Sequence, residues 1–375
     1  MKNMYSDWRV WSVIGVMAAQ SFVGTAVMAQ ELPTRSNQVM MTAVSSGSDI
    51  NKVVLSTPTG VVNETEGIHL PPKAKDTYIL EKAKRLFHPA PNSRLEPFVV
   101  PEGWMHTSFQ VGNVPMERLH HNKAESKRIV LQLHGGGYVL GMSDAHRKLG
   151  VKQALESGAS DIYFVDYRLA PRHVYPSALE DAVTAYRHIL ETGIESNQVL
   201  LAGDSAGGNL ALALAIYLKE HNMPQPGALL LASPWATMED KAGTTRTSNA
   251  TRDYILGIGT PLYNEVRQPS YVGTQKVTDY HVSPIYADLR GLPPILIQAG
   301  GNELFLTEDE ELAKKAAADG VKVTLSVYPG MPHDFALLYP ELEESVDSFQ
   351  EIASFVAQNV TINKEDKREE KEGMR

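Results

Sequence analysis

Short apolar runs alternate with amphipathic stretches along most of the chain after residue 128. The predicted strands, each a short apolar run, are 129–133, 162–167, 199–202, 228–232, 295–298 and 323–328. The predicted helices, where apolar residues recur every three or four positions, are 177–190, 207–220, 307–318 and 341–358. Continuous apolar strands that alternate with helices are typical of a mostly parallel sheet covered by helices on both faces. The predicted fold class is therefore α/β.

The segments before this region have weaker patterns. A helical pattern within 66–98 ends at a proline-rich stretch, and two alternating stretches at 107–111 and 115–120 predict early edge strands. Residues 30–65 are rich in Ser, Thr, Asn and Val without lasting periodicity, which predicts a linker or a loosely ordered arm.

One interval interrupts the alternation further along the chain. Residues 239–286 mix Thr, Arg, Gly and Tyr with few apolar runs, and loops of this length inside a domain are usually lids or insertions. We expect one domain over 66–362, followed by a charged, disordered tail at 363–375 that has no apolar face.

The amino terminus has the pattern of an export signal. Lys2 and Arg9 precede an uncharged stretch that closes on Val27-Met28-Ala29, a small-residue cleavage pattern. We predict a signal peptide over 1–29 and a periplasmic or secreted mature protein without stable membrane insertion. The alternative is a retained anchor, since the uncharged stretch is almost long enough for one membrane-spanning helix.

Composition narrows the classes of partner and chemistry. The formal net charge of -9 and the absence of a basic stripe argue against nucleic acid as a partner. The chain has no cysteine, so disulfides, thiolate nucleophiles and cysteine-ligated zinc are excluded. We expect neither a metal nor a cofactor. The sequence leaves open whether the protein forms a homodimer.

The strongest local pattern is Gly203-Asp204-Ser205-Ala206-Gly207. It follows the apolar run 199–202 and opens the predicted helix 207–220, so Ser205 stands on a sharp turn between a strand and a helix. Such a turn forces strained backbone angles on its central residue and needs very small neighbours, which Gly203 and Gly207 supply. This is the form of a nucleophile elbow, which predicts that Ser205 is an activated nucleophile.

A nucleophilic serine needs a base and a carboxylate that orients it, and on such a fold these follow later strands in the order acid, then histidine. His333 follows the last predicted strand in a Pro/Gly-rich loop and is the predicted base. Glu303 comes first after the glycine turn that ends strand 295–298 and is the predicted acid. Asp309 is the alternative, although it has the position of an acidic residue in the first turn of a helix.

Acyl transfer also needs donors for an oxyanion. Gly135-Gly136-Gly137 follows the first strong strand, and glycines let backbone amides approach a substrate oxygen closely. We predict an oxyanion hole from the amides of Gly136 and Gly137 on one side and of Ala206, at the start of the elbow helix, on the other.

Five motifs in this order resemble the hormone-sensitive-lipase-like carboxylesterases of the α/β-hydrolase fold. They are His134-Gly-Gly-Gly137, Tyr167-Arg-Leu-Ala-Pro171 with Tyr175-Pro-Ser-Ala-Leu-Glu-Asp-Ala182, Gly203-Asp-Ser-Ala-Gly-Gly208, Ser283-Pro284 with Gly291-Leu-Pro-Pro294, and Tyr328-Pro-Gly-Met-Pro-His333. The resemblance implies the same nucleophile, base and oxyanion site. It also implies that His134 and Asp204 support the loops, and that residues from 66–98 and 239–286 form a cap over the acyl pocket.

Two positions depart from the family pattern. Many members have Asp where Glu303 stands, and many have Gly where Asp334 follows His333. The first departure bears on the identity of the acid, and the second is expected to alter only the wall of the site.

These observations predict a serine carboxylesterase that acts on short- to medium-chain acyl esters of small molecules through an acyl-enzyme. The alternatives are a lipase, or an amidase or deacetylase, with the same three residues. A non-catalytic binding protein on this scaffold is the remaining alternative, and it is disfavoured because His333 is present.

Overall fold

The computed structural model describes residues 39–43, 54–56, 67–89, 97–122 and 126–360. The predicted export signal and the charged tail lie outside the described residues. No helix in the described ranges is long and apolar enough to cross a membrane.

A single twisted sheet forms the centre of the molecule. Its strands are β1 (Val39–Ala43), β2 (Val54–Ser56), β3 (Trp104–Val111), β4 (Val114–His121), β5 (Ile129–Leu133), β6 (Asp161–Val165), β7 (Val199–Asp204), β8 (Ala228–Ala232), β9 (Ile295–Gly300) and β10 (Val323–Tyr328). They lie in the order β2-β1-β10-β9-β8-β7-β5-β6-β4-β3. The six strands from β10 to β6 in this order are parallel, and the pairs at both edges are antiparallel.

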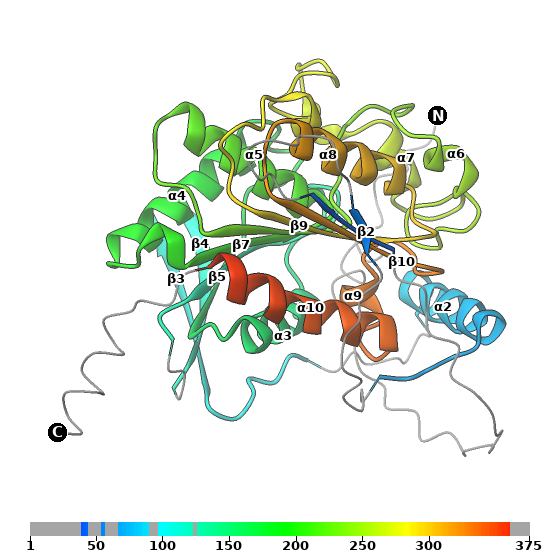
Figure 1. Ribbon diagram of the computed structural model, residues 1–375, viewed down its shortest axis with the longest axis horizontal. Helices are drawn as coiled ribbons and strands as arrows, with labels where there is room; N and C mark the ends of the chain where they lie inside the picture. Colours follow the sequence, from blue (N-terminus) through cyan, green and yellow to red (C-terminus); the bar gives the residue numbers. More distant parts are fainter. Residues whose placement is uncertain (1–38, 44–53, 57–66, 90–96, 123–125, 361–375) are drawn as a thin grey trace.

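Helices cover both faces of the sheet. The longer ones are α2 (Pro72–Phe87), α3 (Asp144–Ser157), α4 (Ser177–Glu191), α5 (Ala206–Glu220), α8 (Leu306–Ala318) and α10 (Glu343–Asn359). Figure 1 shows α4, α5 and α8 on one face and α3 and α10 on the other, with α2 on the side where α10 begins. Lys75 of α2 forms an ion pair with Glu344 in the first turn of α10. This arrangement confirms the predicted α/β class with a mostly parallel sheet.

The core lies between these layers and the central strands. Every residue of β5 and β7 is buried, as their mostly apolar sequences predict for strands covered on both faces. Leu210, Leu214 and Leu218 on α5 are completely buried, and each contributes about 2 kcal/mol through its apolar surface. The elbow helix is thus fixed firmly against the sheet.

Three elements were not predicted from the sequence. The segment expected to be an arm, 30–65, contains β1 and β2, because β1 pairs with the otherwise open edge of β10 and satisfies its backbone groups. Helix α3 is also new, since its sequence has no clear apolar stripe and its burial comes from contacts with α10, α9 (Phe335–Leu338), β5 and β6.

The long interval 239–286 contains only short helices. They are α6 (Thr245–Ser248), α7 (Tyr263–Arg267), and the 3₁₀ turns η2 (Ser270–Val272) and η3 (Pro284–Tyr286). The Tyr254 hydroxyl of this interval donates a 3.0 Å hydrogen bond to Asp76 on α2. The two segments expected to form a cap therefore contact each other.

Candidate active site

Ser205 lies at the turn between β7 and α5, with φ 52° and ψ -118°. This region of backbone space is unfavourable for a residue with a side chain, and it is maintained by hydrogen bonds on both sides. The Ser205 amide donates to the carbonyl of Ala232 at 2.9 Å, and its carbonyl accepts from the amide of Trp235 at 3.0 Å. The strand end β8 thus holds the strained turn in place.

The two flanking glycines allow the turn to pack closely. A Cβ atom on Gly203 would lie 2.2 Å from the carbonyl oxygen of Gly207, and one on Gly207 would lie 2.0 Å from the carbonyl oxygen of Leu133. Both distances are far inside van der Waals contact. The elbow therefore has no room for any side chain at these two positions.

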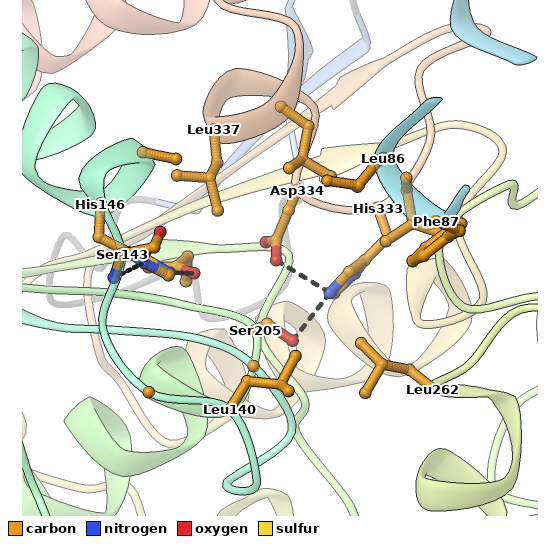
Figure 2. A pocket seen from close by; sticks show the side chains of 16 residues that line it. Leu86, Phe87, Leu140, Ser143, His146, Ser205, Leu262, His333, Asp334 and Leu337 are labelled. Atoms are coloured by element: carbon orange, nitrogen blue, oxygen red, sulfur yellow. Dashed lines mark hydrogen bonds and ion pairs between the residues drawn. The ribbon is translucent and has the colours of Figure 1, made fainter. Parts of the chain in front are cut away.

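His333 follows β10 and reaches Ser205 across the end of the sheet. Its Nε2 atom lies 2.8 Å from the Ser205 Oγ atom, and its ring packs edge-on against Phe305 (Figure 2). The ring is almost completely buried. Burial alone would lower the pKa of His333, but the carboxylates of Asp334, Glu303 and Asp253 raise it to about 9.

Glu303 follows β9 and is completely buried near the same imidazole. Its Oε2 atom accepts hydrogen bonds from the Ser233 hydroxyl at 2.6 Å and from the Gly300 amide at 2.8 Å. Its Oε1 atom and the Nδ1 atom of His333 are both buried, and neither atom forms a hydrogen bond within the described part of the chain. The negative charge of Glu303 helps to raise the pKa of His333, so the two groups are close enough to interact electrostatically.

Asp309, the alternative acid, lies in the first turn of α8 and is also completely buried. Burial and the neighbouring Glu303 carboxyl raise the pKa of Asp309 well above its usual range. Two buried carboxyls in contact avoid repulsion when one is protonated, and here the proton belongs on Asp309. Asp309 therefore interacts with Glu303 rather than with the imidazole.

The glycine loop after β5 lies against the elbow. Asp204 joins the two, because its carboxylate accepts hydrogen bonds from the Gly135 amide at 2.9 Å and from the Gln132 side chain at 3.0 Å. Gly136 and Gly137 have φ of 108° and 63°, which are conformations that glycine adopts readily. Along the described chain, the amides of Gly136, Gly137 and Ala206 donate to no other protein group.

His134 supports this loop from behind. Its ring stacks on Tyr167 with centroids 4.1 Å apart, and its Nδ1 atom lies 2.8 Å from the Gly135 carbonyl oxygen. Burial, together with the nearby His146, lowers the pKa of His134 to about 3. It is therefore neutral at ordinary pH, and its contacts are those of a structural residue.

A cavity of about 40 Å³ opens beside Ser205. Its walls come from the glycine loop, the His333 loop and both expected cap segments. Leu86 and Phe87 at the end of α2, and Ile255 and Leu262 from the interval 239–286, supply apolar surface over Ser205. Figure 2 shows Leu262 and Phe87 near His333, with Ser143 and His146 on the side of Asp334.

No cluster of three or more His, Asp or Glu side chains with the arrangement of a metal site occurs among the residues that the structure describes.

Comparisons with known proteins show the family to which the chain belongs. A model of the alpha/beta hydrolase fold matches residues 130–337. An esterase of Acinetobacter venetianus is 33% identical over 240 residues, which cover 62% of this chain and 76% of the relative. An acetyl-hydrolase of Streptomyces hygroscopicus is 35% identical over 229 residues, which cover 61% and 75% of the two chains.

A solved structure of an esterase from the bacterial hormone-sensitive lipase family has a TM-score of 0.69 at 30% identity. The match covers 78% of this chain and 100% of that one. The chain belongs to the hormone-sensitive-lipase-like carboxylesterases of the α/β-hydrolase fold. It is a carboxylic ester hydrolase.

The active site of this carboxylesterase differs from the predicted one mainly at Asp334. The sequence predicts only a change in the wall of the site, but the Asp334 Oδ2 atom lies 3.2 Å from the Nε2 atom of His333. This expectation was wrong because the backbone at Asp334 is left-handed, with φ 52° and ψ 37°, and the side chain lines the cavity beside the imidazole.

Sequence reasoning also missed Ser233 and Asp253. Ser233 links the two loops, because its hydroxyl donates to Glu303 and accepts from the Asp334 amide at 3.1 Å. Its position directly after β8 could have indicated it, since polar residues at the carboxyl ends of parallel strands often lie at the site. Asp253 comes from the long interval and had no comparable signal.

Proposed function

We propose that this carboxylesterase hydrolyses short-chain acyl esters through an acyl-enzyme on Ser205. The observation that carries the proposal is the 2.8 Å contact between Ser205 Oγ, on a strained elbow, and the Nε2 atom of His333. A serine hydroxyl becomes nucleophilic when an adjacent base removes its proton as the new bond forms.

In the first half of the reaction, the Ser205 oxygen attacks the ester carbonyl carbon and its proton passes to Nε2 of His333. The carbonyl oxygen becomes an oxyanion that accepts from the amides of Gly136, Gly137 and Ala206. These three amides are free to serve as the donors. The alcohol then leaves with the proton from Nε2, and the acyl group stays on Ser205.

Glu303 is the proposed orienting acid. Its Oε1 atom would accept from Nδ1–H of His333, which leaves Nε2 of the neutral ring free to accept the Ser205 proton and stabilises the imidazolium that forms. Two donors already hold its Oε2 atom, so the carboxylate keeps one orientation. Asp204 and His134 act indirectly, because they fix the position of the glycine loop.

The size of the cavity supports short acyl chains over the medium-chain end of the predicted range. At about 40 Å³ it is far smaller than the ~150 Å³ apolar cavity that accepts benzene in an engineered protein. An acetyl or propionyl group fits such a space without movement of its walls. A longer chain would have to displace Leu86, Phe87 or Leu262.

Ser205→Ala provides the decisive experiment. We expect p-nitrophenyl acetate turnover to fall to the uncatalysed rate while circular dichroism and the melting temperature stay close to wild type. Turnover within tenfold of wild type would refute the role of Ser205. A series of p-nitrophenyl esters from acetate to decanoate, with and without emulsified substrate, then tests chain length. A maximum at octanoate or beyond, with activation at an interface, would favour a lipase.

A further inference from the structure

Asp334 places a second carboxylate on the catalytic imidazole, at the nitrogen that faces the substrate. The Asp334 Oδ2 atom lies 3.2 Å from Nε2 of His333, and the same Nε2 atom lies 2.8 Å from Ser205 Oγ. Figure 2 shows Ser205 and Asp334 on either side of this nitrogen. In the proposed mechanism Glu303 serves Nδ1, so Asp334 acts at the other nitrogen of the ring.

The free oxygen of this carboxylate has no partner. Asp334 Oδ1 is buried without a hydrogen bond to any group in the described structure, and the side chain is only 9% exposed. A buried carboxylate oxygen without a hydrogen bond is unusual in a folded protein unless a ligand or a reactant pairs with it. Asp334 also lines the cavity beside Ser205. The Asp334 carboxylate is therefore part of the wall of the space next to the nucleophile.

The group that occupies this space changes during the reaction. The leaving alcohol takes its proton from Nε2, and the water that cleaves the acyl-enzyme later gives a proton to the same atom. Water at this position has two O–H groups. Only one can donate to Nε2, and the Asp334 carboxylate beside Nε2 is an acceptor for the other.

We propose that Asp334 positions the hydrolytic water by accepting its second O–H bond, and thereby directs the acyl-enzyme toward water rather than toward alcohols. The inference rests on the proposed acyl-enzyme on Ser205. An alcohol that enters the same position has a single O–H group. It can satisfy Nε2, but it then presents carbon to the Asp334 carboxylate and displaces water from it.

The step itself is balanced as follows. The water oxygen bonds to the acyl carbon, one water proton passes to Nε2, and the other stays on the oxygen, hydrogen-bonded to Asp334. The tetrahedral intermediate collapses as the bond from the acyl carbon to Ser205 Oγ breaks. Ser205 Oγ takes the proton from Nε2, and the carboxylic acid leaves. Asp334 gains and loses no proton.

Partitioning between water and methanol tests this directly. The acyl-enzyme formed from p-nitrophenyl acetate is allowed to react at a fixed methanol concentration, and acetic acid and methyl acetate are measured. Their ratio does not depend on how much enzyme is folded or on the rate of acylation. A changed basicity of His333 affects both nucleophiles, so it leaves the ratio largely unchanged.

Asp334→Gly and Asp334→Asn are the appropriate variants, because Gly and Asn both tolerate the left-handed backbone at this position. We expect the ratio of acid to methyl ester to fall about tenfold in Asp334→Gly, as for the loss of one hydrogen bond to a charged acceptor. Asp334→Asn keeps an acceptor oxygen and should give an intermediate ratio. Ser143→Ala removes another polar side chain from the same cavity and should leave the ratio unchanged.

A ratio in Asp334→Gly within twofold of wild type would overturn the proposal, and so would an equal fall in Ser143→Ala. If Ser205→Ala abolishes turnover while the ratio does not respond to Asp334, the inference fails and the proposed function stands. If Ser205→Ala keeps its turnover, the proposed function itself fails, whatever the ratio.

Discussion

Removing the charge of Asp334 should move the acid limb of the pH–rate profile to lower pH. The groups that face the His333 ring are Ser205, Asp334, Glu303 and Asp253, and the last three are carboxylates. Asp334→Asn removes the charge that lies 3.2 Å from Nε2 and keeps the size of the side chain. The other two carboxylates remain in place.

The magnitude follows from the opposing effects on the imidazole. Burial lowers the pKa of His333 and the carboxylates raise it, with a net value of about 9 against an ordinary value of 6.5. An opposite charge in contact changes a pKa by about 1–3 units, and Asp334 has the largest raising effect, so its loss should lower the pKa by about 1–2 units. His333 must be neutral to accept the Ser205 proton. The wild-type kcat/KM should therefore rise with pH through about 9, and the variant should reach its plateau about 1–2 pH units earlier.

The assay is kcat/KM for p-nitrophenyl acetate across pH, which reports the free enzyme, with subtraction of alkaline background hydrolysis. Glu81→Gln is the matched control, because it removes the same charge from an exposed position on α2. Its acid limb should coincide with that of wild type. An acid limb in Asp334→Asn that coincides with that of wild type would refute the electrostatic reasoning.

Two further predictions concern the acid and the elbow. Glu303→Gln should lower kcat by at least about 100-fold, because the imidazole loses its orienting carboxylate. Asp309→Asn should keep kcat within about tenfold of wild type. If steady-state kinetics give the reverse order, Asp309 is the acid. Gly207→Ala should abolish activity and lower the free energy of unfolding by about 3 kcal/mol or more. The reason is that the added Cβ would lie 2.0 Å from the Leu133 carbonyl oxygen. An unchanged midpoint of urea denaturation would contradict this prediction.

The central sheet is predicted well from the sequence, because strands that are buried on both faces consist mainly of apolar residues. Strands β5, β8 and β10 begin and end at the predicted residues, and the helices α4, α5, α8 and α10 lie within two residues of their predicted bounds. Helix α3 escaped prediction because it is held by neighbours on several sides, so its apolar residues do not form one stripe. β1 pairs with a strand almost 300 positions away, and no local pattern indicates such a pairing.

The candidate site also combines features that follow from the strand order with features that no local pattern indicates. Strand order places Ser205, Glu303 and His333 at the same edge of a parallel sheet, so their proximity follows from topology once the strands are recognised. Their detailed contacts depend on loop conformation. Ser233 and Asp253 reach the site through a strained turn and through the long interval 239–286, neither of which has a periodic pattern to interpret.

Asp334 shows why the environment of the imidazole cannot be predicted from the sequence alone. A sequence places two acidic residues near His333, but it cannot say which ring nitrogen each one faces, and the two positions have opposite consequences. A carboxylate at Nδ1, the proposed place of Glu303, holds the proton away from Nε2 and helps the base at every step. A carboxylate at Nε2 favours the protonated ring and so opposes the base at neutral pH, yet it can hold the second proton of the attacking water. An enzyme with both arrangements is therefore expected to work best at alkaline pH and to release its acyl group to water in preference to alcohols.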